Sequence, residues 1–290
     1  MEGKGTSLYL KAGDSVPVAA LLHGIATVSA NDASVVLAEG YAGDTTTWTR
    51  LMNAEARRLG MADSRFATPN GWPDGGATYV SADDLVTLSR ALIERFPAQY
   101  RTYFGQKHFA WNGVTRESHD PTVGLVPGAD GIKTGFTREA GYNFLGSAQR
   151  DRRRLVMVVA GAKSEAQRAD LSRRLLEWGF SAWKRHDLFR AHGLVGTAAV
   201  QGGAVPTVGL VAASDIYAAI PRDGAAPAGL AIRYDGPLVA PIAKGAEVAR
   251  LEIRWSADAP PRYVPLRAAR SVAAAGPFRR LLNGLAGLLA

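Results

Sequence analysis

The sequence predicts an α/β (α+β) domain, in which helices flank an antiparallel sheet, followed by a small C-terminal β-sandwich domain and a terminal amphipathic helix. Three observations predict this class. Apolar residues recur at helical spacing up to about residue 180, two adjacent apolar runs within that region have the form of a β-hairpin, and short strand-like runs follow. We therefore expect three parts, at residues 1–186, 187–272 and 273–290.

The first two predicted helices carry their own start or stop residues. Pro17 opens an apolar helix over residues 17–28, since proline is tolerated in a first helical turn. Asp44 precedes a second run with apolar residues mostly at helical spacing, and Gly60 ends that run.

Two further helices are marked by capping residues. Ser81 caps an apolar-periodic run. Ser164 and Gln167 form a capping box for another helix, which we expect to end near Trp178-Gly179.

Two apolar runs, Gly141–Ala148 and Leu155–Ala162, predict an antiparallel hairpin. The polar segment Gln149–Arg154 between them is the predicted turn. The segment Asp130–Phe136, which reads DGIKTGF, lies just before the hairpin and is predicted to form a third strand.

The second part predicts a small sandwich, because short β-type runs recur there between Gly, Pro and Asp. The predicted strands are Val205–Val211, Ile216–Ile220, Leu230–Tyr234 and Val248–Trp255.

The C-terminal segment FRRLLNGLAGLLA predicts an amphipathic helix. At about 1.5 Å per residue it reaches roughly 20 Å, which is too short to span a bilayer. It can lie in the membrane interface or pack on the protein, and the pattern alone does not decide between these. The residues expected to contact a membrane are Phe278, Arg279, Arg280, Leu281, Leu282 and Leu285.

Composition excludes several classes of function. The 290 residues contain no cysteine and five scattered histidines, so we expect no metal site and no thiol nucleophile. The net charge of +8 allows an anionic partner, but no nucleic-acid-binding motif accompanies it. No apolar leader and no run long enough to span a membrane are present, which on composition alone indicates a cytoplasmic protein.

Two short motifs bear chemistry. Lys133-Thr134-Gly135 lies on a predicted strand, where Lys133 and Gly135 share one face because side chains alternate. Ser29-Ala30-Asn31 lies between two helices, where the hydroxyl can relay a proton and the amide can hold a substrate carbonyl. Taken singly, the first motif also fits an ordinary strand with an exposed lysine. The second also fits a simple helix cap.

The amino-acid sequence around the two motifs resembles one family. The segments SLYLKAGDSVPVAALLHGIATVSANDASVVLAEGYAG, LMNAEARRLGMADSRFATPNGW, SADDLVTLSRALIERFP, DGIKTGFTREAGYNFLGSAQR and LLEWGF occur in this order. They resemble the D-alanyl-D-alanine carboxypeptidases among the low-molecular-weight penicillin-binding proteins. The resemblance runs from about Thr6 to Phe180 and continues more weakly to the C-terminal segment.

The resemblance implies a penicillin-binding/β-lactamase-like transpeptidase fold. It also implies a serine-type enzyme that removes the terminal D-alanine from peptidoglycan pentapeptides through an acyl-enzyme, without a cofactor. Stem peptides and β-lactams are the implied partners. The resemblance also implies export to the periplasm, where the C-terminal helix would lie on the outer face of the inner membrane. This location replaces the cytoplasmic one that composition alone indicates.

Roles follow from the resemblance residue by residue. Ser29 matches the family's proton-shuttling serine, Asn31 its substrate-orienting asparagine, and Lys133 the lysine that gives the site positive charge. The implied substrate-binding residues are Thr134 and Gly135 of the substrate-contacting strand, the backbone N–H of Phe136 as an oxyanion donor, and Arg168 at the carboxylate end. For Arg168 alone, an ordinary salt bridge is the alternative.

Three positions depart from the family pattern. Ala30 replaces the usual glycine of Ser-x-Asn, and Phe136 stands where histidine often follows Lys-Thr-Gly. Ser118-His119-Asp120 stands where an Asn-Arg-Asn-like stretch is common. His119 can supply part of the missing positive charge or be an ordinary loop histidine.

The family nucleophile, a Ser-x-x-Lys roughly sixty residues before Ser-x-Asn, has no counterpart upstream of Ser29. The only Ser-x-x-Lys, Ser181-Ala182-Trp183-Lys184, follows Lys-Thr-Gly at a domain junction, so we reject it. We expect an N-terminally truncated chain whose nucleophile precedes Met1, which is inactive and poorly stable because apolar surface is left exposed. The alternatives are a non-catalytic peptidoglycan- or membrane-binding relative, or a β-lactamase-like or endopeptidase activity on the same fold.

Overall fold

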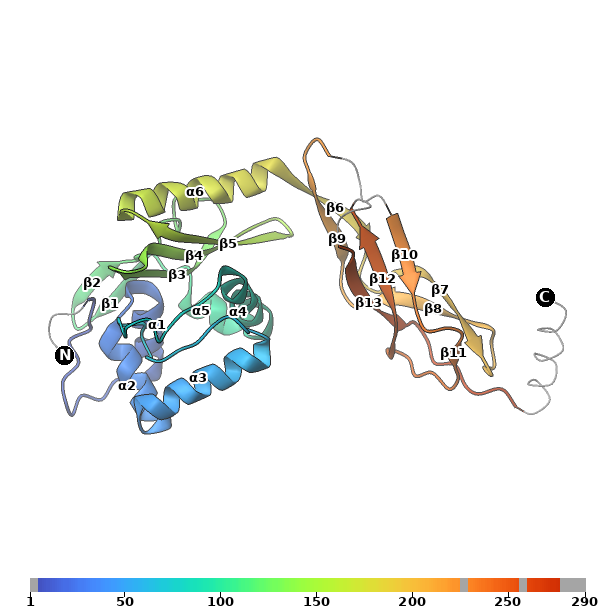
Figure 1. Cartoon of the computed structure of the whole chain (residues 1–290), viewed down its shortest axis with the longest axis horizontal. Helices are drawn as coiled ribbons and strands as arrows, with labels where there is room; N and C mark the ends of the chain where they lie inside the picture. Colours follow the sequence, from blue (N-terminus) through green and yellow to red (C-terminus); the bar gives the residue numbers. More distant parts are fainter. Residues whose placement is uncertain (1–4, 225–228, 256–259, 277–290) are drawn as a thin grey trace. The chain divides into compact units, whose positions relative to one another are not determined.

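The computed structural model describes residues 5–224, 229–255 and 260–276. It divides into two compact units, Met1–Phe180 and Ser181–Ala290, each of which has its own sheet (Figure 1). No helix among the described residues is long and apolar enough to cross a membrane. The predicted amphipathic helix, residues 278–290, lies outside the described residues.

Unit 1 is built on a three-stranded antiparallel sheet of order β3-β4-β5 with helices on both sides (Figure 1). Its helices are α1 (Val18–Val28), α2 (Asn31–Ala42), α3 (Thr45–Leu59), α4 (Ala82–Arg95), α5 (Pro97–Tyr103) and α6 (Glu165–Ala182). Its strands are β1 (His108–Trp111), β2 (Val114–Glu117), β3 (Ala129–Thr137), β4 (Gly141–Arg150) and β5 (Arg153–Ala162).

The two faces of this sheet are covered by different helices because side chains alternate along each strand. Phe144 on β4 packs on one side with Leu176 of α6. Its neighbour Leu145 packs on the other side with Tyr100 of α5 and Leu92 of α4. The predicted antiparallel sheet with flanking helices is thereby confirmed, whereas α5, β1 and β2 were not predicted.

The predicted caps explain where several helices begin and end. The Asp44 side chain accepts a hydrogen bond from the Thr47 N–H, and the Ser81 side chain accepts one from the Asp84 N–H. Gly60 adopts the left-handed conformation that ends α3. The Ser164 hydroxyl accepts the Gln167 N–H at the start of α6.

Two predicted boundaries are wrong. The segment Gln149–Arg154 is mostly strand, since β4 and β5 extend into it and only residues 151–152 turn. The backbone pairing of Gln149 with Arg154 and of Arg150 with Arg153 extends both strands. Two of these arginines also form ion pairs with acids outside the segment, Arg150 with Glu177 and Arg154 with Asp130.

The other wrong boundary is the end of α6, which continues past Gly179 to Ala182. Glycine is useful inside this helix, because a Cβ at Gly179 would lie 2.7 Å from the Leu155 side chain. The close approach of α6 to β5 at this point therefore accounts for a glycine that the sequence suggested as a helix end.

Unit 2 is β-rich, as predicted. Its strands are β6 (Trp183–Phe189), β7 (Leu194–Gln201), β8 (Thr207–Ala212), β9 (Ile216–Pro221), β10 (Gly229–Arg233), β11 (Leu238–Val239), β12 (Glu247–Arg254) and β13 (Arg262–Ala268). A six-stranded sheet has the order β10-β12-β13-β8-β7-β11, and β6 pairs with β9. The predicted runs correspond to β8, β9, β10 and β12. The predictions missed β6, β7, β11 and β13. Of these, β7 and β13 mix small or charged residues with their buried positions.

Candidate active site

The Ser29-Ala30-Asn31 motif forms the corner between α1 and α2. Ser29 ends α1 in the left-handed conformation, with φ 59° and ψ 41°. An L-residue rarely adopts this conformation outside special sites. The Ala30 methyl is fully buried in the cluster that contains Leu8 and Val28, so the extra methyl at this family glycine position fits the fold.

Lys133 brings the second motif to this corner. Its Nζ donates to Ser29 Oγ at 2.7 Å and to the Thr134 carbonyl at 2.8 Å. Burial, with the nearby Arg168 cation, lowers the pKa of Lys133 to about 8. Residues 104 positions apart therefore form a pair in which a proton can pass between nitrogen and oxygen near neutral pH.

Arg168 provides a second, permanent cation beside Lys133. Only 4% of the residue is exposed. Its guanidinium donates to Glu165 at 2.9 Å and lies 5.8 Å from the centre of the Tyr142 ring. Within the described residues, its buried Nε has no hydrogen-bond partner. Arg168 is thus a buried cation with an ion pair and an unsatisfied N–H donor near Lys133.

His119 lies beside the same cations. Its backbone N–H donates to the Thr27 carbonyl, which fixes the loop after β2 against the end of α1. Partial desolvation of the ring, followed by the positive charge of Lys133, holds the pKa of His119 below its ordinary value. The imidazole is therefore neutral at neutral pH, and the positive charge of this region comes from Lys133 and Arg168.

The rest of the Lys-Thr-Gly strand borders the site. Among the described strands, β3 is an edge of its sheet, so one side of its backbone is not paired with another strand. A Cβ added at Gly135 would meet nothing within 4 Å, which leaves open space above this edge. Phe136 is 55% exposed, and its ring packs 4.3 Å from that of Tyr142.

Sequence reasoning missed the residues that hold Asn31. The Asn70 amide donates to Asn31 Oδ1 at 3.0 Å, and Asn31 Nδ2 donates to the Thr6 carbonyl at 3.2 Å. The two contacts fix which way the Asn31 amide points. Asn70 stands in an Asn-Gly pair that predicts only a turn, so no pattern in the sequence linked it to Asn31.

Asp32 fixes the segment that passes over this corner. Its carboxylate accepts hydrogen bonds from the Ser7 hydroxyl and from the backbone N–H groups of Leu8, Leu10 and Ala33. Burial alone would raise the pKa of Asp32, but these donors together lower it. The carboxylate therefore stays ionised and ties the N-terminal segment to the start of α2.

The alternative Ser-x-x-Lys lies at the junction of the two units, where both of its ends contact Arg222. Lys184 Nζ donates to the Arg222 carbonyl at 2.7 Å, and the Ser181 carbonyl accepts from the Arg222 guanidinium. The lysine amine is thus bound to a backbone oxygen of unit 2.

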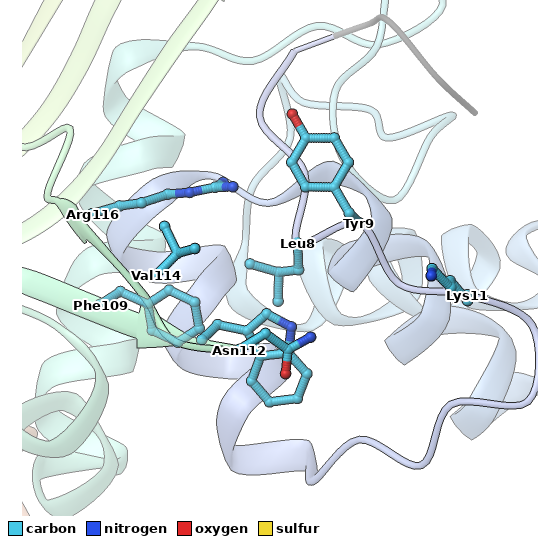
Figure 2. Close-up of a pocket in the computed structure, with 8 residues that line it drawn as sticks. Leu8, Tyr9, Lys11, Phe109, Asn112, Val114 and Arg116 are labelled. Atoms are coloured by element: carbon cyan, nitrogen blue, oxygen red, sulfur yellow. The ribbon is translucent and has the colours of Figure 1, made fainter.

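A separate pocket of about 250 Å³ lies between the N-terminal segment and the β1–β2 hairpin (Figure 2). Leu8, Phe109 and Val114 line it, with Lys11 and Arg116 at its edge. It contains none of the residues of the two motifs. In the part of the chain that the structure describes, no three metal-ligating side chains come together either.

Comparison with known proteins follows the same division as the fold. Residues 1–164 match the D-alanyl-D-alanine carboxypeptidase family, and residues 183–274 match the C-terminal domain of penicillin-binding protein 5. The chain belongs to the D-alanyl-D-alanine carboxypeptidase family. The predicted family, fold class and class of serine-type enzyme are confirmed.

Individual relatives agree with this assignment. The carboxypeptidase DacD of Salmonella typhimurium is 34% identical over 286 residues, which covers 96% of this chain and 71% of that protein. DacA of Escherichia coli is 35% identical over 224 residues, covering 76% of this chain and 54% of that protein. The crystal structure of penicillin-binding protein 5 from Haemophilus influenzae has a TM-score of 0.79 at 29% identity, covering 93% of this chain and 78% of that one.

Proposed function

We propose that this D-alanyl-D-alanine carboxypeptidase relative binds peptidoglycan stem peptides that end in D-alanyl-D-alanine, and that β-lactams occupy the same site. One observation carries the proposal. Lys133 Nζ lies 2.7 Å from Ser29 Oγ, so two motifs on separate elements converge on one point beside Arg168. A solved relative, penicillin-binding protein D2 of Listeria monocytogenes, has ampicillin bound.

The binding role divides among the named residues. The cations of Arg168 and Lys133 attract the terminal carboxylate of the peptide. The Asn31 amide, held by Asn70, orients a peptide carbonyl. The peptide backbone can pair with the open side of β3, where Thr134, Gly135 and the Phe136 N–H lie, as an added strand.

Proton transfer is the proposed role of the Ser29–Lys133 pair. When an acyl group passes from the peptide to a serine, the C–N bond to the terminal D-alanine breaks and the departing amine needs a proton. Lys133 in its charged form gives that proton to Ser29, whose own hydroxyl proton goes to the amine. A lysine with a pKa near 8 is suited to this exchange.

We further propose that these 290 residues alone do not form the acyl-enzyme. Acylation in this family requires a serine with a lysine base three residues later. Ser181 and Lys184 are the only pair with this spacing, and Lys184 is bound to the Arg222 carbonyl. The proposed location is the periplasm, on the outer face of the inner membrane, as the resemblance implies.

Intact-mass measurement after incubation with benzylpenicillin tests this reading, together with calorimetric titration of the same sample. We expect saturable, reversible binding and an unchanged mass. A covalent adduct of one penicillin would contradict the inactivity, and peptide mapping would identify the serine that reacted. Absence of any binding would contradict the proposed substrate site.

A further inference from the structure

Lys133 lies on a strand that, among the described strands, is hydrogen-bonded to a neighbouring strand on one side only. Ser29 belongs to the helical corner, whereas Lys133 belongs to β3, which among the described strands is bonded to β4 alone. Side chains alternate along a strand, so a shift of β3 by one residue would turn Lys133 to the opposite face. The contact of 2.7 Å therefore requires that something fix the register of β3.

A β-bulge at Asp130 sets this register. Ala129 pairs with Ala148 and Gly131 pairs with Ser147, so Asp130 is an extra residue on β3. It lies three positions before Lys133. The alternation that places Lys133 toward Ser29 begins at this bulge.

The Asp130 carboxylate is bound from across the sheet. The Arg154 guanidinium, on β5, donates to its two oxygens at 2.9 and 2.8 Å. The same guanidinium donates to Ser147 Oγ on β4 at 2.6 Å and to Gln149 Oε1 at 2.7 Å. One side chain thus joins all three strands at the position of the bulge. Such a two-pronged ion pair fixes direction as well as distance.

Tyr100 holds the bulge from the helical side. Its hydroxyl donates to Asp130 Oδ1 at 3.2 Å, and only 3% of the residue is exposed. Burial, with the Asp130 carboxylate, raises the pKa of Tyr100, so the phenol remains a donor. A Cβ at Gly131, whose φ is +142°, would lie 3.0 Å from that hydroxyl. The contact therefore accounts for the glycine after Asp130.

We propose that Arg154 and Tyr100 are positioning residues for the reaction: by holding the Asp130 bulge they fix the register of β3 and so keep Lys133 against Ser29. Neither residue touches the Ser29–Lys133 pair in the structure. The inference rests on the proposed function of that pair, but its geometric part can be tested without substrate.

The test compares two arginines on the same sheet. Arg154→Gln removes the ion pair to Asp130. Arg150→Gln, the matched control, removes the ion pair to Glu177 from a side chain that is similarly exposed, 26% against 24%. The ε-methylene signals of ¹³C-labelled lysine are followed by NMR from pH 6 to 11, and the Lys133 signal is identified by its loss in Lys133→Arg.

We expect Lys133 to titrate near pH 8 in the wild-type protein and in Arg150→Gln. In Arg154→Gln it should titrate at least one unit higher, because a displaced lysine regains water. Affinity for a D-Ala-D-Ala peptide should fall about tenfold, in line with the loss of a charge-assisted contact. Arg154→Lys keeps the charge but cannot bind both Asp130 oxygens as a guanidinium does, so the Lys133 pKa in this variant should lie between those in the wild-type protein and in Arg154→Gln. Tyr100→Phe should give a smaller shift of the same sign.

An unchanged Lys133 titration in Arg154→Gln, or an equal shift in Arg150→Gln, would overturn the positioning role. If Arg154→Gln does not fold, the Lys133 titration is measured in Arg154→Lys and Tyr100→Phe instead. An unshifted Lys133 titration in both variants would overturn the positioning role. If the wild-type protein binds no peptide but the titration shifts as expected, the proposed function fails while the positioning role stands.

Discussion

The two units bury different kinds of side chain. Of the ten buried polar or charged residues among those described, nine lie in unit 1 and one, Glu252, lies in unit 2. Glu252 is bound by two arginines, Arg233 and Arg254, of its own sheet. The core of unit 2 is one continuous apolar cluster, whereas unit 1 is divided among three smaller clusters.

The difference indicates that the binding groups lie in unit 1 and that unit 2 has a mainly structural role. Burying a cation such as Arg168 or Lys133 costs free energy unless it is paired, and unit 1 contains two such cations near Ser29. In the described part of unit 2, Glu252 is the one buried charged side chain. We therefore expect substitutions in unit 2 to change stability without changing binding. Substitutions at the Ser29 corner should change binding more than stability.

The largest expected effect on stability comes from the core of unit 2. Ile253→Ala removes a side chain with no exposed surface, and should lower the free energy of unfolding by about 2–5 kcal/mol. Urea unfolding followed by circular dichroism measures it, and Val239→Ala, at a position 71% exposed, is the control. A Lys133 titration that moves in Ile253→Ala would contradict the separation of the units.

Arg168→Met should break the binding function of unit 1. Loss of the buried cation is expected to weaken binding of a D-Ala-D-Ala peptide about thirtyfold, roughly 2 kcal/mol. The pKa of Lys133 should rise, because a repelling charge is gone. Arg174→Met on the same helix, an exposed arginine paired with Asp170, should leave both quantities unchanged. Calorimetric titration and lysine NMR measure them.

Lys133→Met should stabilise the protein in a pH-dependent way. The folded-state pKa near 8 lies below the unfolded value of about 10.4, so between these values only the unfolded chain holds the proton. The free energy of unfolding of the wild-type protein therefore rises with pH across this window and is lowest below pH 8. Allowing for partial exposure, the advantage of Lys133→Met should shrink by roughly 2 kcal/mol from pH 7.5 to 10.5. Urea unfolding at several pH values measures this. A difference in the free energy of unfolding between Lys133→Met and the wild-type protein that does not change with pH would contradict the lowered pKa of Lys133.

The smallest expected effect is at Asn70. Asn70→Ala removes the donor that orients Asn31, and should weaken peptide binding about fivefold, the value of one ordinary hydrogen bond. Asn70→Asp keeps the shape but offers an acceptor to Asn31 Oδ1, so it should bind no better than Asn70→Ala. Wild-type affinity in both variants would show that Asn70 does not contribute to peptide binding.

Local chemistry made much of the fold predictable. Asp44, Ser81 and Gly60 act through neighbours a few positions away, so their caps could be read from the sequence. Arg154 and Asn70 act on residues 24 and 39 positions away, respectively. Nothing in their neighbourhoods identifies those partners. The local sequence likewise predicts a turn at Arg154, whereas the backbone of this residue pairs with Gln149 on β4.

The candidate site was predictable for a different reason. Spacing alone left Ser29-Ala30-Asn31 as a possible helix cap and Lys133 as a possible surface lysine. The resemblance to a family predicted that they meet, and the Lys133–Ser29 hydrogen bond brings them together. The neutral state of His119 could not be predicted, because it depends on charges that only the fold brings close.

Calorimetric titration with diacetyl-L-lysyl-D-alanyl-D-alanine measures whether the Ser29–Lys133 site binds the proposed substrate. The comparison peptide is the same molecule ending in L-alanyl-L-alanine, and the comparison protein is Lys133→Met. We expect saturable binding of the D,D peptide by the wild-type protein, at least tenfold weaker binding of the L,L peptide, and loss of the preference in Lys133→Met. Equal affinity for both peptides, or a preference that survives Lys133→Met, would contradict it.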